Sequence, residues 1–211
     1  MIINELVVGP LMSNCFIVGC EKTGEAVVID PGGDAGRILS SLAASELTVK
    51  YILNTHGHFD HVSGNRQMKD ATGADILIHP LDAPMLTRLS SNAAFFGISV
   101  ENSPPCDRTI EEGETVSFGE VRLKVIHTPG HTPGGVAFYS NGIVFVGDTL
   151  FSGSIGRTDF PGGDYDTLIA SIEKKLFPLG DDVRVLNGHG PETTIGNEKR
   201  FNPFVGQNRM F

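Results

Sequence analysis

The sequence has no tryptophan, few cysteines, fewer basic than acidic residues and no long hydrophobic run. Its 211 residues include three cysteines, 16 Lys and Arg, and 25 Asp and Glu, for a formal net charge of −9. Three cysteines cannot all pair, so we expect a reduced, cytoplasmic chain. The shortage of Lys and Arg argues against a nucleic-acid partner. No apolar run approaches the roughly 18 residues of a membrane-spanning helix. The first residues do not read as a secretory signal, so no membrane partner is expected.

The rest of the composition is typical of a folded globular chain, with 40% hydrophobic and 19% charged residues. In both halves, short apolar runs that end in polar residues alternate with stretches of helical periodicity. We therefore expect an α/β (α+β) fold with helices outside two packed sheets. Residues 1–211 are expected to form one domain, whose two similar halves meet near residues 100–112.

Local patterns add three predictions about secondary structure. The dipeptide Asn141-Gly142 between two apolar runs is a strong hairpin signal. Apolar residues at helical spacing predict helices over residues 81–97 and 165–177. From Glu198 onward we expect only a short tail.

Four potential metal ligands lie within six positions of one segment, Thr55-His56-Gly57-His58-Phe59-Asp60-His61. In an extended loop alternate residues project to one side, so His56, His58 and Asp60 can converge on a shared centre. His61 then begins the next helix and can turn toward a neighbouring centre. Neutral imidazoles and carboxylates are natural ligands of zinc and iron. A helix cap needs one polar residue rather than four, so the segment favours a metal site.

Three more candidate ligands follow other apolar runs: His131, Asp148 and His189. His131 lies in a loop that prolines and glycines stiffen, and Asp148 opens a glycine-rich loop. A single residue of this kind is usually structural or solvated. Together with the first cluster, however, the three complete a set of donors for two metal ions.

In this order, HxHxDH followed by His131, Asp148 and His189, the residues resemble those of the metallo-β-lactamase superfamily. The resemblance implies a four-layer αββα sandwich with the metals at one edge of the two sheets. It implies that one ion is held by His56, His58 and His131 and that the other is held by Asp60, His61 and His189. Asp148 would bridge the two ions. Asp30, at the end of an early strand, would support the metal loop from behind.

Within the superfamily the sequence is most similar to glyoxalase II, the hydroxyacylglutathione hydrolases, in its short single-domain bacterial branch. The likeness rests on segments 127–134, 147–151 and 188–194. It implies hydrolysis of a small-molecule thioester by a hydroxide that two divalent ions share, zinc first and iron as the other choice. Asp60 and Asp148 would fix the position of that hydroxide.

The substrate-binding residues depart from those of two-domain glyoxalase II. Arg157 falls where that family has a basic residue that grips glutathione, and it is our candidate substrate contact. Asp159, however, stands where the family has an aromatic contact. Residues 191–211 are too few for the family's helical second domain. The acyl thioester or ester that is cleaved is therefore left open.

Three alternatives remain open on the sequence. Persulfide dioxygenases share the fold and segment 156–160, and use one iron at a triad that would be His56, His131 and Asp148. Class B β-lactamases carry Cys or Ser where Asp148 stands. A binding module without activity should show gaps in the ligand set, but all seven positions are filled. The chain is expected to act as a monomer or a homodimer.

Overall fold

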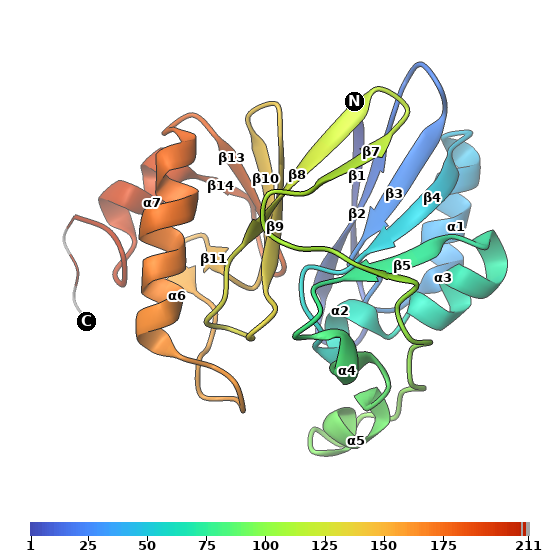
Figure 1. Ribbon diagram of the computed structural model, residues 1–211, viewed down its shortest axis with the longest axis horizontal. Coiled ribbons are helices and arrows are strands. Elements are labelled where there is room, and N and C mark those ends of the chain that lie inside the picture. Colours follow the sequence, from blue (N-terminus) through green and yellow to red (C-terminus); the bar gives the residue numbers. More distant parts are fainter. Residues whose placement is uncertain (208, 210–211) are drawn as a thin grey trace.

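Two β-sheets lie face to face between two sets of helices in the computed structural model, which describes residues 1–207 and 209 (Figure 1). In spatial order the first sheet consists of β1 (Ile2–Val8), β2 (Ser13–Gly19), β3 (Glu25–Ile29), β4 (Thr48–Leu53), β5 (Asp75–Ile78) and β6 (Arg108–Thr109). The second consists of β14 (Thr193–Thr194), β13 (Arg184–Asn187), β10 (Ile143–Gly147), β9 (Val136–Ser140), β8 (Val121–His127) and β7 (Thr115–Phe118). A separate hairpin pairs β11 (Leu150–Phe151) with β12 (Ser154–Ile155).

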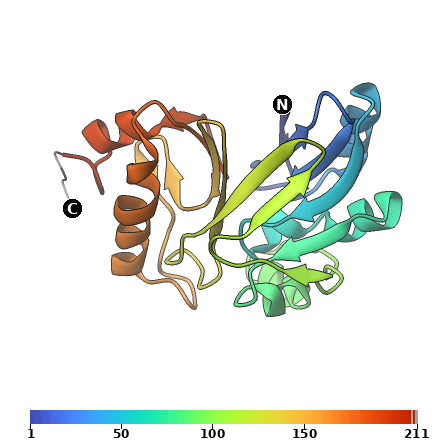
Figure 2. The same cartoon turned by 45° about the horizontal axis from the view of Figure 1, so that its top comes forward.

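Helices cover the outer face of each sheet, as both views of the molecule show (Figure 1, Figure 2). The segments that connect strands of the first sheet form five helices: α1 (Ala35–Ala44), α2 (Phe59–Val62), α3 (Asn65–Thr72), α4 (Ala83–Leu86) and α5 (Leu89–Ala94). The second carries α6 (Tyr165–Ser171), extended by η1 (Ile172–Leu176) and η2 (Phe177–Leu179), and α7 (Ile195–Phe201). The chain passes from the first sheet to the second between β6 and β7.

Three layers of buried apolar side chains hold the four layers of secondary structure together. Strand β3 shows how alternation along a strand produces them. Val27 and Ile29 point between the sheets, whereas Ala26 and Val28 point toward the helices of the first sheet. A third apolar cluster lies between the second sheet and its helices. The predicted αββα sandwich is therefore confirmed, because each sheet buries both of its faces.

The predicted hairpin is present, with Asn141 and Gly142 at positive φ between β9 and β10. The helix predicted over residues 81–97 is wrong in part, because the chain forms α4 and α5 with a break at Thr87 and Arg88. The break lets the last residue of α4, Leu86, and the first of α5 both be fully buried. A tertiary contact also starts α5, since Asn102 Oδ1 accepts a hydrogen bond from the Ser90 amide at 2.9 Å.

The short tail expected from Glu198 is also wrong, because this residue lies within α7. The Glu198 side chain is fully buried and accepts hydrogen bonds from Thr193 Oγ1, Gly153 N and Asn202 Nδ2. Because a charged residue occupies a core position, the apolar periodicity of this helix cannot be seen in the sequence. Burial of the Glu198 carboxylate is favourable only because tertiary hydrogen-bond partners surround it.

No helix within residues 1–207 and 209 is both long enough and apolar enough to cross a membrane.

The layer between the sheets is expected to dominate stability. Phe145 is fully buried there, and its ring meets Phe16 edge-on at 5.3 Å. Phe145→Ala should lower the free energy of unfolding by about 3–5 kcal/mol, through lost burial and the cavity it leaves. Urea unfolding measures the change, with the 72% exposed Phe201→Ala as the control. The control should stay within about 0.5 kcal/mol of wild type. Equal losses in the two variants would contradict this account.

Candidate metal centre

The predicted metal ligands lie together at one edge of the two sheets, where several strands end. The first sheet supplies the four residues that follow β4, namely His56, His58, Asp60 and His61. The second sheet supplies the residues that follow β8, β10 and β13, namely His131, Asp148 and His189. The loops meet without a gap. A Cβ at Gly188 would lie 2.1 Å from Asp148 Oδ1 and 2.7 Å from His61 Cε1, so only glycine fits there.

The first group of donors consists of His56, His58 and His131. One ligand atom from each lies within 4.8 Å of the others. His58 Nδ1 and His131 Nε2 are 2.9 Å apart. His56 and His131 are buried, whereas His58 is only partly buried and faces the open side of the group.

The second group consists of Asp60, His61 and His189. Asp60 Oδ2 lies 3.4 Å from His61 Nε2 and 3.2 Å from His189 Nε2, and the two imidazole nitrogens are 3.3 Å apart. Ligands at 2.0–2.1 Å around a tetrahedral zinc ion are separated by about 3.3 Å. The group therefore already has the spacing that a small divalent cation requires.

Asp148 stands between the two groups and contacts both. Its Oδ2 lies 3.7 Å from His131 Nε2 and 3.6 Å from His189 Nε2, and its Oδ1 lies 3.3 Å from His61 Nε2. His56 Nε2 and Asp148 Oδ1 are buried without a hydrogen-bond partner among residues 1–207 and 209. Buried polar atoms are rarely left unpaired. A cation between the groups would satisfy both atoms, so the donor set fits metal ions.

Asp30 holds the first-sheet side of the centre. Its carboxylate accepts hydrogen bonds from Thr55 N at 2.7 Å and Thr55 Oγ1 at 2.5 Å, and contacts His61 Nδ1 at 3.1 Å. Since the Thr55 hydroxyl donates its proton to Asp30, it accepts from His56 Nδ1, which lies 3.0 Å away. His56 Nε2 is then the unprotonated nitrogen, free to bind a metal. Asp30 thus orients two ligands from behind.

Burial and neighbouring imidazoles keep His56 and His58 of the first group neutral. Burial, and then the charges of His61 and His131, hold the pKa of His56 well below its ordinary value. Burial and His131 lower the pKa of His58 to about 4. Near neutral pH both rings therefore carry free lone pairs, the form that binds metal ions.

The second group contains an ionised carboxylate and, together with Asp148, attracts positive charge. Burial by itself would raise the pKa of Asp60, but His61 and His189 outweigh it and hold the pKa far below its ordinary value. The pKa of Asp148 is lowered against burial in the same way, chiefly by His61. Conversely, burial opposes protonation of His61, but Asp148 and Asp60 raise its pKa well above the usual range. A divalent ion supplies the positive charge that this group otherwise draws from protons.

An extended loop predicts that Asp60 lies with His56 and His58, but the structure places it in the second group. Helix α2 begins at Phe59, so alternation along the chain ends at His58. Asp60 and His61 are consecutive residues of the first helical turn, and both reach His189. The segment is extended at His58 and helical at Asp60, and this change of backbone divides it between the two groups.

Arg157 lies outside the donor groups, on the loop that follows β12. Its guanidinium forms two 2.7 Å hydrogen bonds with the carboxylate of Asp159, and it stacks on Phe160 with Cζ 3.8 Å from the ring centroid. The guanidinium lowers the pKa of Asp159 to about 2. The Arg157 carbonyl accepts a hydrogen bond from His131 Nδ1 at 2.7 Å. The loop thus contacts the centre through its backbone and presents Arg157 at the surface.

Asp82 is a functional candidate that the sequence motifs did not reveal. This fully buried residue follows β5, and its carboxylate ties together the two loops that carry the first group. Oδ2 accepts hydrogen bonds from Gly57 N at 3.0 Å and Thr132 Oγ1 at 2.7 Å, and Oδ1 accepts from Gly134 N at 2.7 Å. In the sequence Asp82 reads as an ordinary polar residue after a strand. The one signal in the sequence was that Asp82 follows β5, a strand of the sheet that also carries His56 and His58.

Two sheets with helices outside and paired imidazole and carboxylate donors at their shared edge define a metal-binding αββα protein. The family model of the metallo-β-lactamase superfamily matches residues 8–189. The chain belongs to this superfamily, as its motifs predicted. Its members bind divalent metals, usually two, which agrees with the two donor groups.

Relatives and solved structures cover nearly the whole chain. A protein named hydroxyacylglutathione hydrolase GloC, from Haemophilus influenzae, is 41% identical over 97% of this chain and 98% of the relative. The crystal structure of BLEG-1 B3 metallo-β-lactamase is 36% identical, with TM-score 0.91 and coverage of 97% and 99%. TTHA1623 in a di-iron-bound form is 40% identical, with TM-score 0.88 and coverage of 95% and 99%. ETHE1 from Myxococcus xanthus is 30% identical, with TM-score 0.83 and coverage of 99% and 87%.

Asp82→Ala should weaken zinc binding about 10–100-fold, because the loops that carry His56, His58 and His131 lose their shared anchor. Competition with a chromogenic chelator measures the affinity. Glu198→Ala is the matched control, since it removes a buried, hydrogen-bonded carboxylate outside the donor groups. Both variants lose stability, but the control should keep its zinc affinity within about twofold. Equal zinc affinities in the two variants would contradict the proposed anchoring role of Asp82.

The metal-free protein should show the depressed pKa of His58 in its stability. Between about pH 6.5 and pH 4 the unfolded chain binds a proton at this residue that the folded chain does not bind. The contribution of His58 to the free energy of unfolding therefore falls as the pH falls. Urea unfolding of chelator-treated wild type and His58→Gln should show their difference shifting by about 3 kcal/mol between pH 7 and pH 4. A difference that does not change with pH would rule this out.

Proposed function

We propose that the protein is a metal-dependent thioester hydrolase of the hydroxyacylglutathione hydrolase type, with one divalent ion in each donor group. One observation carries the proposal. The second group has its three donors at 3.2–3.4 Å from one another, beside a complete first group, with Asp148 in contact with both. The likeness to the relative named hydroxyacylglutathione hydrolase GloC supports the same reaction.

The donor chemistry suits zinc and also iron. Three imidazoles would hold the first ion, two imidazoles and a carboxylate the second, and Asp148 would contact both. Such ions, when bound, act as Lewis acids on a carbonyl and lower the pKa of a water molecule to about 7. The likeness to TTHA1623 in its di-iron-bound form supports iron as well as zinc.

The chain's own residues would position the reacting groups. Asp60 and Asp148 stay ionised, and each is slightly exposed at the mouth of the centre, where a carboxylate accepts a hydrogen bond from the attacking water. Ser13 Oγ donates to Asp60 Oδ2 at 3.2 Å and steadies that carboxylate. His58 and His189 are the more exposed imidazoles and border the side from which substrate would approach. A thiolate leaving group needs little protonation, so no separate general acid is required.

The cellular setting and the small-molecule substrate belong to the same proposal. The three cysteines are free, which suits a reduced, cytoplasmic chain. Arg157 is the proposed substrate contact, on the loop that accepts a hydrogen bond from His131.

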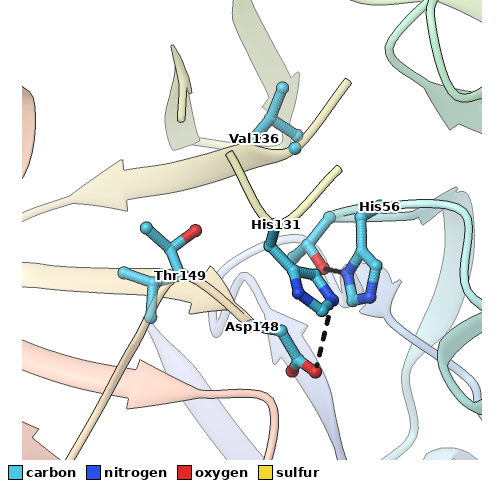
Figure 3. A pocket seen from close by; sticks show the side chains of 8 residues that line it. His56, His131, Val136, Asp148 and Thr149 are labelled. Carbon is cyan, nitrogen blue, oxygen red and sulfur yellow. Dashed lines mark hydrogen bonds and ion pairs between the residues drawn. The ribbon is translucent and has the colours of Figure 1, made fainter. Parts of the chain in front are cut away.

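A second candidate is a persulfide dioxygenase with a single iron. A small pocket is lined by His56, His131 and Asp148 together with Thr55 and Thr149 (Figure 3). Two imidazoles and one carboxylate form the facial triad that suits non-haem iron. This reading leaves Asp60, His61 and His189 without a function, although their spacing suits a cation. The hydrolase is therefore the better supported function.

His189→Ala separates the two activities. In a hydrolase this variant empties the second group, so cleavage of lactoylglutathione by the zinc-loaded protein should fall at least about 100-fold. His127→Ala, which removes a partly buried histidine outside the donor groups, should retain most of the rate. Thioester cleavage is followed by ultraviolet absorbance, and metal content by mass spectrometry.

The same preparations are offered glutathione persulfide, with oxygen uptake recorded, and a chromogenic cephalosporin. The hydrolase is expected to cleave thioesters with zinc and to consume no oxygen. Oxygen uptake that requires iron and survives His189→Ala would replace the hydrolase with the dioxygenase. Cephalosporin cleavage that exceeds thioester cleavage would place the activity with the β-lactamases.

A further inference from the structure

An aromatic ledge, formed by Phe59, Phe96, Phe160 and Arg157, borders the first donor group at its partly exposed histidine. The ring of Phe160 lies 5.6 Å from that of His58 and 6.0 Å from that of Phe96, edge-on to both. Phe96 in turn lies 5.6 Å from Phe59. Phe160 and Phe96 thus extend from the donor group toward the end of α5, labelled at the bottom of Figure 1, and the buried Phe59 supports Phe96 from α2.

The ledge is fixed relative to the donor groups by its backbone. The loop that carries Arg157 and Phe160 accepts a hydrogen bond from His131 at the Arg157 carbonyl, at 2.7 Å. One residue earlier, a Cβ at Gly156 would lie 1.8 Å from the Asp148 carbonyl oxygen. The loop is therefore pressed against the centre at two points. A group that lies on the ledge is held at a set distance from the donors.

The one charged side chain of the ledge is balanced by a neighbouring carboxylate. The only cation on it, Arg157, forms two 2.7 Å hydrogen bonds with Asp159, and its planar guanidinium covers one face of Phe160. A guanidinium that is already paired with a carboxylate is a weak ligand for a second one. Its flat face and the neighbouring rings still offer an apolar, stackable surface.

Two adjacent phenylalanines differ in their contact with the ledge. Phe96 is 48% exposed and contacts two rings of the ledge, whereas Phe95 is 89% exposed. The half-exposed Phe96 offers apolar area next to the centre that a substrate can bury. Phe95 supplies a matched position with the same side chain.

We propose that the substrate carries an apolar, ring-sized group that lies on the aromatic ledge. We further propose that Asp159 keeps Arg157 from selecting substrates that bear a carboxylate. This names the substrate class of the proposed hydrolase and rests on that function: thioesters with an aromatic or similarly bulky group beside the scissile carbonyl, among which glutathione thioesters are cleaved but are not preferred for their carboxylates.

Matched thioesters test the ring on each side of the carbonyl. Mandeloylglutathione differs from lactoylglutathione by a phenyl in place of a methyl group, which tests the acyl side. Lactoyl thioesters of benzyl and of methyl mercaptan test the thiol side. In at least one pair we expect kcat/KM to favour the ring by roughly three- to tenfold. Phe96→Ala should abolish this preference, and Phe95→Ala should retain it. Equal rates in both pairs, or a preference that survives Phe96→Ala, would contradict the proposed role of the ledge in substrate binding.

Asp159→Asn tests the charge. The amide keeps the size of the side chain but removes the charge that pairs with Arg157. Relative to the uncharged N-acetylcysteamine thioester of the same acid, kcat/KM for the glutathione thioester should rise about three- to tenfold. An unchanged ratio would overturn the role of Asp159.

Failure of the ledge can be told apart from failure of the hydrolase. If no thioester is cleaved at all, the proposed function fails. Binding affinities measured by calorimetry then test whether the ledge binds an apolar ring. Mandelate should bind more tightly than lactate, or benzyl mercaptan more tightly than methyl mercaptan. The difference should disappear in Phe96→Ala and remain in Phe95→Ala. The absence of any such difference would overturn the ledge independently of catalysis.

Discussion

The rest of this structure depends on the close approach of imidazoles and carboxylates at the edge shared by the two sheets. Contacts of 2.9 to 3.7 Å join these donors, and His56 Nε2 and Asp148 Oδ1 are buried there without a hydrogen-bond partner in the described chain. Ionised Asp60 and Asp148 draw positive charge toward the second group, while burial keeps His56 and His58 neutral. Divalent ions answer both conditions, since they supply charge to the carboxylates and accept lone pairs from neutral rings.

The scaffold supports this arrangement from both sides. Behind the centre, Asp30 engages the backbone and hydroxyl of Thr55 and one imidazole. At its flank, Asp82 joins the loop that carries His56 and His58 to the loop that carries His131. These anchors rest on strands that bury both faces in three apolar layers. Because a packed core resists small displacements, donors at the strand ends hold their spacing before a metal ion arrives.

Under the proposed function, the chemistry of the centre and the choice of substrate reside in different residues. The donors, with their supports, would perform the same reaction on many acyl compounds. In our proposal, selectivity is a property of the rim, where the aromatic ledge lies beside His58. The two are mechanically linked, because the loop that carries Arg157 and Phe160 also accepts the hydrogen bond of His131. A change of rim residues can therefore alter the substrate without moving the donors, provided that this backbone contact persists. The fold is shared across the superfamily, so its members can differ in function through the residues of the site and its rim.

The order of residues by itself determined the family, the αββα layers and the candidate donors, because dense histidine motifs and alternating apolar strands are written locally. It also determined the Asn141-Gly142 hairpin, a turn that short-range backbone preference sets. The family resemblance also implied how the donors divide into two groups, but local alternation placed Asp60 with His56 and His58, and only the tertiary structure shows why it lies elsewhere: α2 begins at Phe59 and turns Asp60 toward His189. The tertiary structure alone revealed Asp82 and the break between α4 and α5, and it placed the buried Glu198 inside a helix. Each of these depends on partners distant in sequence, and contacts of that kind leave no periodic trace along the chain.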